Sequence, residues 1–395
     1  MDNITKIFSS CYKTVNDAMK TSTMNNAKRI VLVTWKGGGN YGTCLQSYAL
    51  HRKLEDLGFD VSLFAAGFHS FGIKTYLKGF LSAIGALKII YFGQWLLMDK
   101  KDRKRVRFQN KAINEIELFS SRQIHRIVLK TDCFVSGSDQ IWNTFYNFSS
   151  FNFLSFAEEA KRIAYATSIG TNYVKEEYRE TVKELLQRYS HIGVREKEAV
   201  RVLSELTGRE DIRQVLDPTF LLMPQDWMDL AKNSVYESKL PVDYIFCYFI
   251  GNNGCYSDCL KEVCRRIGLS CIIIPSQENP MFSFEGAYIY NNAGPVEFVD
   301  LLRRAKYVCT DSFHATALCI NLSVQFVEFM RFSDDDPRSQ NSRIYDLLHH
   351  YDLINRIYKH DSSEWYRPID YKRVQSILNN DRIDSLDFLI NSIEN

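Results

Sequence analysis

Short apolar strands alternate with amphipathic helices along most of this chain. Residues 29–35 are apolar and β-branched and predict a strand. A glycine-rich turn follows, and in residues 43–57 apolar side chains recur at helical spacing until Gly58 ends the helix. Residues 59–64 predict the next strand. A strand–helix–strand unit of this kind builds a parallel sheet with helices on both faces.

The same alternation returns in the second half, after a polar stretch at 223–242 with few aliphatic residues. A chain of 395 residues is also longer than one ordinary core supports. We therefore expect an α/β protein with two Rossmann-like domains facing a cleft, in the glycosyltransferase-B-like layout, and small molecules bind in such clefts. The expected parts are an N-terminal extension (1–28), a first domain (29–222), a linker (223–240), a second domain with a histidine turn (241–350) and a C-terminal helical extension (351–395).

Composition excludes several classes of protein. The net charge of +2 provides no field that would attract nucleic acid. The 10 cysteines show no pairing rhythm, and Cys255, Cys259 and Cys264 lack the spacing of a zinc site. The first residues lack the order of a signal peptide. We expect a cytoplasmic protein without a metal or a cofactor.

The apolar segment at 79–98 is followed at once by a basic run. A spanning helix there would divide the first domain. An interfacial helix with basic flanks would bring the protein into peripheral contact with the inner face of a membrane. The alternative is a buried helix pair followed by a solvated charged helix, and the composition favours this alternative.

A histidine turn joins a strand at 306–310 to a helix at 315–321. His314 lies at the carboxyl edge of the predicted sheet, where ligands usually bind. Its side chain can give or take a proton near neutral pH. A histidine that only hydrogen-bonds at the start of a helix is the alternative. Asp311 and Ser312 lie in the same turn.

Residues 37–42 formally match the GxGxxG pattern of dinucleotide-binding loops. Such loops need a carboxylate at the end of the next strand for the ribose, and here that strand ends at Ala65 and Ala66. The interpretation as an NAD site therefore fails. What remains is a tight turn, with Asn40, Tyr41 and Gly42 at a helix N-terminus that can meet an anion or a sugar hydroxyl.

Two more strand ends carry polar side chains. Ser138 and Asp139 follow the strand at 132–136, beside Trp142, which could form the floor of a sugar site; either polar residue could instead cap a helix. Arg195 ends the strand at 191–195 and could hold a phosphate, or pair with an acidic neighbour on the surface. The polar run at 331–343 ends in Arg343 and predicts a loop. This loop could bind phosphate or cover the cleft, and the alternative is a solvated loop without either role.

Taken together, these segments resemble the polysaccharide pyruvyl transferase family. The resemblance extends over about residues 30–350, whereas 68–130 and the tail after 351 match only in general character. The matching segments are 40–42 with 45–50, 132–143, 163–170, 194–197, 216–219, 310–314 and 341–343.

The resemblance implies an enzyme that moves a pyruvyl unit from phosphoenolpyruvate (PEP) to two hydroxyls of one sugar, forming a cyclic ketal. The sugar would belong to a surface polysaccharide or its lipid-linked precursor. His314 matches the family's catalytic histidine and would be the general acid, and Arg195 matches an anion-binding arginine. Arg343 and the glycine-loop amides would assist in holding PEP. The acceptor side is expected in the first domain, and the residues expected to bind substrate are Asn40, Tyr41, Gly42, Ser138, Asp139, Trp142, Arg195, Asp311, Ser312 and Arg343.

One position departs from the family. Some members carry an arginine two residues before the histidine, and here that position is Ser312. Two alternatives therefore stay open. One is a nucleotide-sugar-dependent glycosyltransferase of the same architecture, with residues 251–254 at a pyrophosphate and Glu328 at a ribose. The other is a non-catalytic sugar-binding descendant, since fold alone does not decide function.

Overall fold

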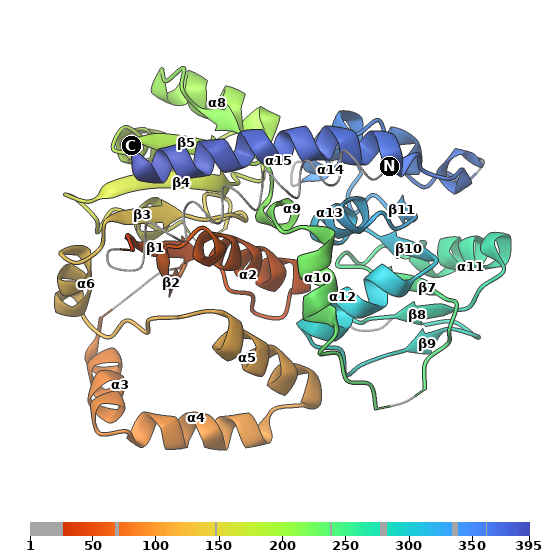
Figure 1. The fold of residues 1–395 in the computed structure, drawn as a ribbon, viewed down its shortest axis with the longest axis horizontal. Coiled ribbons are helices and arrows are strands. Elements are labelled where there is room, and N and C mark those ends of the chain that lie inside the picture. The colour runs from red at the N-terminus through yellow and green to blue at the C-terminus, as the bar shows by residue number, and fades with distance from the viewer. Residues whose placement is uncertain are drawn as a thin grey trace.

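The computed structural model describes residues 27–67, 71–146, 148–237, 239–276, 283–333, 339–360 and 362–395. Two parallel β-sheets lie side by side (Figure 1), six-stranded in order β2-β1-β3-β4-β5-β6 and five-stranded in order β11-β10-β7-β8-β9. The expected N-terminal extension lies almost wholly outside the described residues, and the predicted fold class is confirmed. The strands are β1 (Arg29–Thr34), β2 (Asp60–Ala65), β3 (Cys133–Ser136), β4 (Lys161–Thr167), β5 (His191–Val194), β6 (Arg213–Gln214), β7 (Ile245–Tyr248), β8 (Cys271–Ile273), β9 (Tyr288–Ile289), β10 (Tyr307–Thr310) and β11 (Phe326–Glu328).

Helices cover both faces of the first sheet. Successive side chains of a strand point to opposite faces, and the apolar residues of β1 therefore enter two different cores. Ile30 and Leu32 pack with α2 (Tyr41–Asp56) and with α15 (Tyr371–Glu394). Val31 and Val33 belong to the core on the other face, which is covered by α6 (Ser121–Val128), α7 (Arg179–Leu186) and α8 (Lys197–Thr207).

The second sheet is covered in the same way. One face packs against α12 (Pro295–Arg304) and α13 (Phe313–Leu322), and the other against α11 (Tyr256–Ile267). The strand that was expected at 306–310 is β10 of this sheet and begins one residue later. The remaining helices are α9 (Pro218–Leu221), α10 (Pro224–Ala231), α14 (Asn341–His350) and the short 3-10 turns η1 (Ser150–Phe153), η2 (Glu176–Tyr178), η3 (Ile354–Arg356) and η4 (Glu364–Tyr366).

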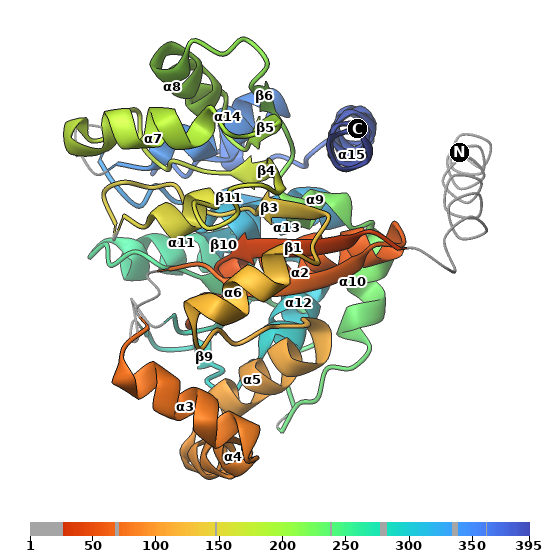
Figure 2. The same ribbon diagram turned by 90° about the vertical axis from the view of Figure 1, so that its left-hand side faces the viewer.

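Apolar packing joins the two sheets. Tyr41 of α2 stacks on Phe298 of α12 at 4.5 Å between ring centroids, and both belong to one buried core. The long helix α15 crosses both domains (Figures 1 and 2), with Leu378 in the core of the second and Leu389 in that of the first. These buried contacts hold the carboxyl edges of the two sheets opposite each other.

Three helices form an arm beneath the first sheet: α3 (Ile73–Ala83), α4 (Ala86–Leu97) and α5 (Lys100–Ala112) (Figure 1). The expectation of a buried helix pair is wrong, because Leu87 is the one buried residue of α3 and α4. Both faces of the sheet are already covered by other helices, which leaves no core for this pair to join. Among the described residues no single helix is long and apolar enough to cross a membrane; α3 and α4 meet that criterion only together, and they are bent by 101°.

Candidate functional site

Both sheets change their winding direction in the middle, between β1 and β3 in the first and between β7 and β10 in the second. Ligands of open α/β sheets bind at the carboxyl ends of the strands at such points. Here the two points face each other across a cavity of about 340 Å³. Its lining comes from the loops after β1, β3, β7, β8 and β11: Trp35, Gly38, Gly39, Asn40, Thr43, Asp139, Gln140, Tyr146, Tyr248, Ile250, Ser276, Arg331 and Gln340.

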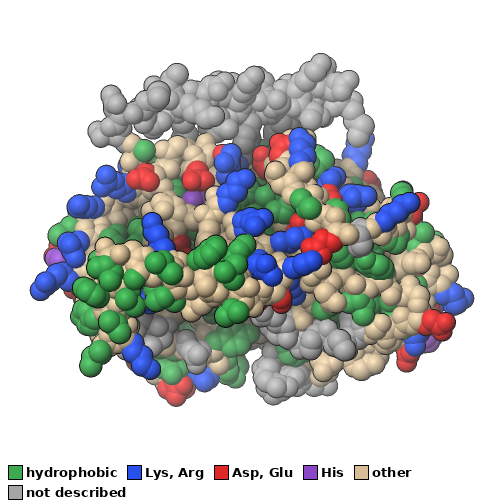
Figure 3. Space-filling view, turned by 90° about the horizontal axis from the view of Figure 1, so that it is seen from below, with side chains coloured by type: hydrophobic (Ala, Val, Ile, Leu, Met, Phe, Trp, Pro, Cys, Tyr) green, Lys and Arg blue, Asp and Glu red, His purple; other side chains and the backbone are tan. Residues whose placement is uncertain are grey.

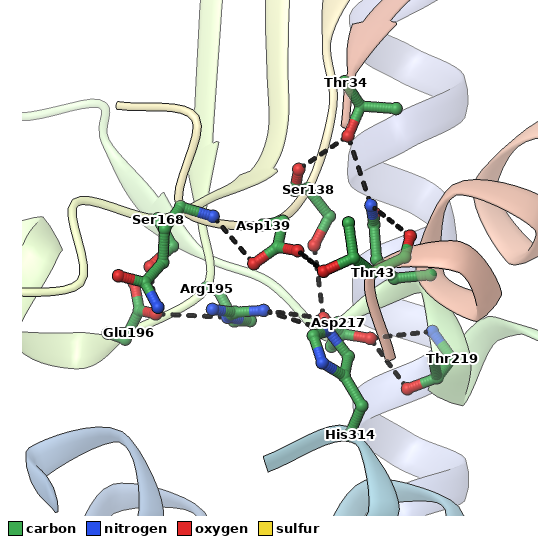
Figure 4. A network of polar contacts seen from close by, with 12 residues as sticks. Thr34, Thr43, Ser138, Asp139, Ser168, Arg195, Glu196, Asp217, Thr219 and His314 are labelled. Carbon is green, nitrogen blue, oxygen red and sulfur yellow. Dashed lines mark hydrogen bonds and ion pairs between the residues drawn. The ribbon is translucent and has the colours of Figure 1, made fainter. Parts of the chain in front are cut away.

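His314 lies in the first turn of α13 and is nearly buried, packed against Gly42, whose neighbour Thr43 lines this cavity. Its Nε2 is 3.5 Å from Oδ2 of Asp217 and 3.4 Å from Nη1 of Arg195 (Figure 4). The ring therefore lies between an acceptor and a donor, so that Nε2 has a partner whether it carries a proton or not. The helix α2 packs against the opposite edge of the ring through Gly42.

Asp217 is the centre of the polar network. Its Oδ2 accepts hydrogen bonds from Arg195 Nη1 at 3.0 Å and from Ser138 Oγ at 3.2 Å. Its Oδ1 accepts two more from the backbone N–H and hydroxyl of Thr219, which starts the short helix α9. Burial raises the pKa of this carboxyl, but the positive charges of His314 and Arg195 and these hydrogen bonds outweigh burial and hold its pKa far below the ordinary value. Asp217 is therefore ionised in the folded protein.

Arg195, at the end of β5, is paired on two sides. Its Nε donates to Glu196 at 3.1 Å, and Glu196 in turn accepts from Ser168. Burial lowers the pKa of the guanidinium, but the charges of Glu196 and Asp217 outweigh this and raise it above the ordinary value. The alternative of a surface ion pair is wrong, since the side chain of Arg195 is 2% exposed. Its Nη2 has no hydrogen-bond partner among the described residues.

A second buried guanidinium lies nearby. Arg343 on α14 and Arg195 both contact the ring of Phe313, at 5.8 and 4.5 Å from its centroid. Burial, with the positive charge of Arg195 adding to it, lowers the pKa of Arg343 to about 10. Its Nη2 donates to Gln340, whereas its Nε has no partner in the described part of the chain. Arg195 has two carboxylate partners, whereas Arg343 pairs with no carboxylate among the described residues, and a buried cation without an anion is costly.

A chain of polar contacts connects this interior with the wall of the cavity. Asp139, which follows β3 in a left-handed conformation (φ 74°), accepts a hydrogen bond from Thr43 at 2.7 Å. The side chain of Gln140 donates a hydrogen bond to Gln340, which also accepts a hydrogen bond from Arg343. Asn40 caps α2 by accepting from the amides of Gly42 and Thr43. These two amides are therefore already bonded and are not open to a phosphate.

Four of the residues expected to bind substrate lie elsewhere. Trp142 is 1% exposed and stacks on Phe153 inside the first domain, so it does not form the floor of the cavity. Tyr41 instead braces the two domains, donating its hydroxyl to Ala293. Asp311 is buried and accepts from the amides of Ile250 and Gly251 and from Tyr256, which ties β10 to β7. Ser312 caps α13.

Ser138 occupies a supporting position. Its hydroxyl bonds Asp217 and its carbonyl accepts from Thr34, so it orients the network behind the cavity. Of the other expected residues, Asn40 and Asp139 line the cavity. Arg195 and Arg343 line a separate cavity of about 150 Å³ together with Asp217. His314 contacts Arg195 on one side and Gly42 on the other.

The structure adds two residues that were not among the expected site residues, Asp217 and Arg331. Asp217 follows a strand-like pair and precedes a proline, a signal of a strand end that could have marked it. Arg331 follows β11, lines the cavity and donates to the backbone carbonyl of Asp311 at 3.2 Å. Its guanidinium thus contacts the residue that precedes Ser312. Residues 334–338, which contain the rest of the charged run, lie outside the described residues.

Glu328 does not serve a ribose. It is completely buried at the end of β11 and accepts a hydrogen bond from the hydroxyl of Thr316. Burial raises its pKa well above the ordinary value. Within the described ranges no His, Cys, Asp and Glu side chains converge to hold a metal ion.

Comparison with known proteins agrees with this architecture. A family model described as polysaccharide pyruvyl transferase matches residues 40–333. No curated protein matches the chain significantly. Among solved structures, a glycosyltransferase from Rickettsia africae is 12% identical, covering 94% of this chain and 100% of its own, with a TM-score of 0.50. The UDP-GlcNAc 2-epimerase of Neisseria meningitidis is 9% identical, covering 92% and 100%, with a TM-score of 0.49. At such low identity the likeness concerns the fold, two α/β domains of the glycosyltransferase B type.

Proposed function

Because the chain belongs to the polysaccharide pyruvyl transferase family, we propose that it transfers a pyruvyl unit from PEP to two hydroxyls of one sugar, with His314 as the general acid. The observation that carries this proposal is the position of His314 Nε2 between Asp217 Oδ2 and Arg195 Nη1. A general acid must hold a proton and then exist without it. Asp217 Oδ2 can accept from an Nε2 that carries a proton, and Arg195 Nη1 can donate to an Nε2 that does not.

The reaction needs one proton to start it. His314 protonates the methylene carbon of PEP, which leaves positive charge on the adjacent carbon. The first sugar hydroxyl attacks that carbon and loses its proton, the carbon–oxygen bond to phosphate breaks, and the second hydroxyl closes the ring. Two hydroxyl protons are released; one restores His314 and one leaves with phosphate. The products are the cyclic ketal and phosphate.

Donor binding requires positive charge, because PEP carries a phosphate and a carboxylate. Arg331 lines the cavity, and the buried pair Arg195 and Arg343 have N–H groups without a partner among the described residues. A guanidinium binds a carboxylate or phosphate through two parallel hydrogen bonds. We assign Arg331 the role of the arginine that Ser312 replaces, because it contacts the neighbouring residue Asp311.

The acceptor is proposed to be a sugar of a surface polysaccharide or of its lipid-linked precursor. Trp35 and Tyr146 line the cavity with their rings 6.1 Å apart, and aromatic rings of this kind pack against the apolar face of a sugar. Polar side chains of the first domain line the same cavity: Asn40, Thr43, Asp139 and Gln140. In this assignment Trp35 takes the place that was expected for Trp142.

A nucleotide-sugar glycosyltransferase remains the second candidate, favoured by the shared fold with the Rickettsia africae glycosyltransferase. Against it, the carboxylate that was expected at a ribose, Glu328, is buried away from the cavity. A non-catalytic sugar-binding protein is the third candidate. It would have no need for a histidine with a partner in each protonation state.

Ligand-dependent melting separates these candidates. A ligand that binds the native state raises its melting temperature by mass action. We expect PEP to raise the melting temperature of the native chain, and Arg331→Ala to abolish the rise, while the exposed Arg188→Ala keeps it. A rise with a UDP-sugar and none with PEP would overturn the proposal in favour of glycosyl transfer. Binding of a sugar alone, with no phosphate released from PEP in the presence of any acceptor, would favour the non-catalytic protein.

A further inference from the structure

The arm of helices α3 and α4 exposes a continuous apolar surface. Ten large hydrophobic side chains of this pair are between 42% and 89% exposed. Monomeric proteins rarely expose a contiguous apolar patch of this kind without a partner. We call it the arm patch; it consists of Ile73, Tyr76, Leu77, Phe80, Ile84, Ile89, Ile90, Phe92, Leu96 and Leu97.

The charged residues of the arm segment itself have one sign, and outside it Glu117 pairs with Lys78 at 3.7 Å. Between Ile73 and Leu97 the sequence contains Lys74, Lys78 and Lys88 and no acidic residue. Lys74 and Lys88 are exposed and pair with no carboxylate in the described part of the chain. In Figure 3 the hydrophobic side chains gather over α3 and α4, with Lys and Arg side chains along their border and toward α5. The surface thus offers apolar contact surrounded by positive charge.

Trp95 lies between the apolar side chains of the arm and the basic side chains of α5. The guanidinium groups of Arg103 and Arg107 on α5 lie 5.5 and 6.0 Å from its ring centroid. Tryptophan and arginine are the side chains that settle at the headgroup level of a bilayer, where one end is apolar and the other polar.

The shape of the arm suits helices that lie on a membrane surface rather than helices that cross the membrane. Helices α3 and α4 have 11 and 12 residues, and a helix needs about 20 to cross the hydrocarbon layer. They meet at 101° and both run along the lower face of the molecule (Figures 1 and 2). Two short apolar helices in this arrangement can both lie at the level of the headgroups.

We propose that the arm patch binds the surface of a bilayer containing anionic lipids, with its apolar side chains inserted among the acyl chains and its lysines and arginines at the phosphates. The possible partners of the arm patch are a second copy of this chain and a membrane, and the positive charge of the arm favours the membrane. Two copies of this chain that met through the patch would bring their lysines together, whereas an anionic bilayer neutralises them. This proposal concerns docking and does not depend on the donor or acceptor of the reaction.

Vesicle flotation of the full chain tests the proposal. We expect the native protein to float with vesicles of phosphatidylcholine and phosphatidylglycerol, and to float much less with phosphatidylcholine alone or at high salt. The triple variant Ile89→Ser, Phe92→Ser, Leu96→Ser should lose binding by a factor on the order of ten or more. A matched control changes three exposed aliphatic residues outside the arm, Leu129→Ser, Val242→Ser and Ile383→Ser, and should float like the native chain.

Two results would overturn the proposal. One is a native chain that stays with the unbound fraction at low salt with anionic vesicles. The other is light scattering that shows a dimer of the native chain and a monomer of the triple variant, which would make the arm patch an interface between copies. The Lys74→Glu, Lys88→Glu variant separates the two contributions, because losing the charges should remove the preference for anionic vesicles while the folded state persists.

Discussion

Gly42 and His314 approach each other so closely that a side chain at position 42 would fit only if the imidazole moved. A Cβ added to Gly42 would lie 2.4 Å from Nδ1 of His314. The first turn of α2 thus presses the imidazole toward Asp217 and Arg195 on its other edge. The requirement is spatial, since Gly42 does not adopt a left-handed backbone conformation. A glycine of the first domain therefore sets the position of a histidine of the second.

Gly42→Ala should displace the histidine ring without unfolding the protein. A misplacement of about 1 Å at the reacting centre can cost on the order of a hundredfold in rate. We expect kcat for phosphate release from PEP to fall by about that factor, with a change of melting temperature of only a few degrees. Gly254→Ala is the control, because an added Cβ there meets nothing within 4 Å. Equal rates for the two variants would show that the close contact has no role in the reaction.

Asp217→Asn should destabilise the protein at neutral pH and much less in acid. The folded-state pKa of Asp217 lies below its unfolded value, so ionised Asp217 contributes stability above the unfolded pKa of about 3.9, and this contribution is lost as the pH falls below it. Breaking a buried ion pair costs about 3–5 kcal/mol. Melting curves measured as a function of pH should show that the difference in melting temperature between the variant and the native protein shrinks below about pH 4. The exposed Asp387→Asn should follow the native curve throughout.

Glu328→Gln should stabilise the protein at neutral pH. The folded-state pKa of Glu328 is raised by burial, so the folded protein binds a proton that the unfolded chain has lost, and stability falls as the pH rises above the unfolded pKa of about 4.3. Glutamine mimics the protonated carboxyl and keeps an oxygen for the hydroxyl of Thr316. We expect a rise of a few degrees in the melting temperature at neutral pH and none in acid. A lower melting temperature of the variant at neutral pH would contradict this assignment.

Trp142 and Trp35 should respond in opposite ways to replacement. Trp142→Ala removes a ring that is stacked inside the first domain and should cost about 3–5 kcal/mol of stability without a specific effect on the acceptor. Trp35→Ala empties the wall of the cavity and should raise KM for the acceptor sugar with little loss of stability. Steady-state kinetics and melting of both variants check this pair. A KM effect in Trp142→Ala at unchanged stability would restore the original expectation for that residue.

Several elements of the fold follow from local patterns. The helix α12 carries its own end signals, with a proline at its first position and two arginines in its last turn. The strands at the centre of both sheets follow from runs of β-branched and apolar residues. His314 and Arg195 were singled out because each follows a strand, and parallel strands bring their carboxyl ends to one edge.

Only the tertiary structure decided which of these side chains meet. Asp217 became the partner of His314 through a contact between residues 97 positions apart, and no local pattern encodes such a distance. Trp142 and Trp35 are both aromatic residues after a strand, yet one turns into a core and the other lines the cavity. The apolar composition of α3 and α4 predicted burial, but the faces they would cover were already taken. Sequence periodicity determined the elements because it acts over a few residues, whereas burial, pairing and exposure depend on how distant segments share a limited interior.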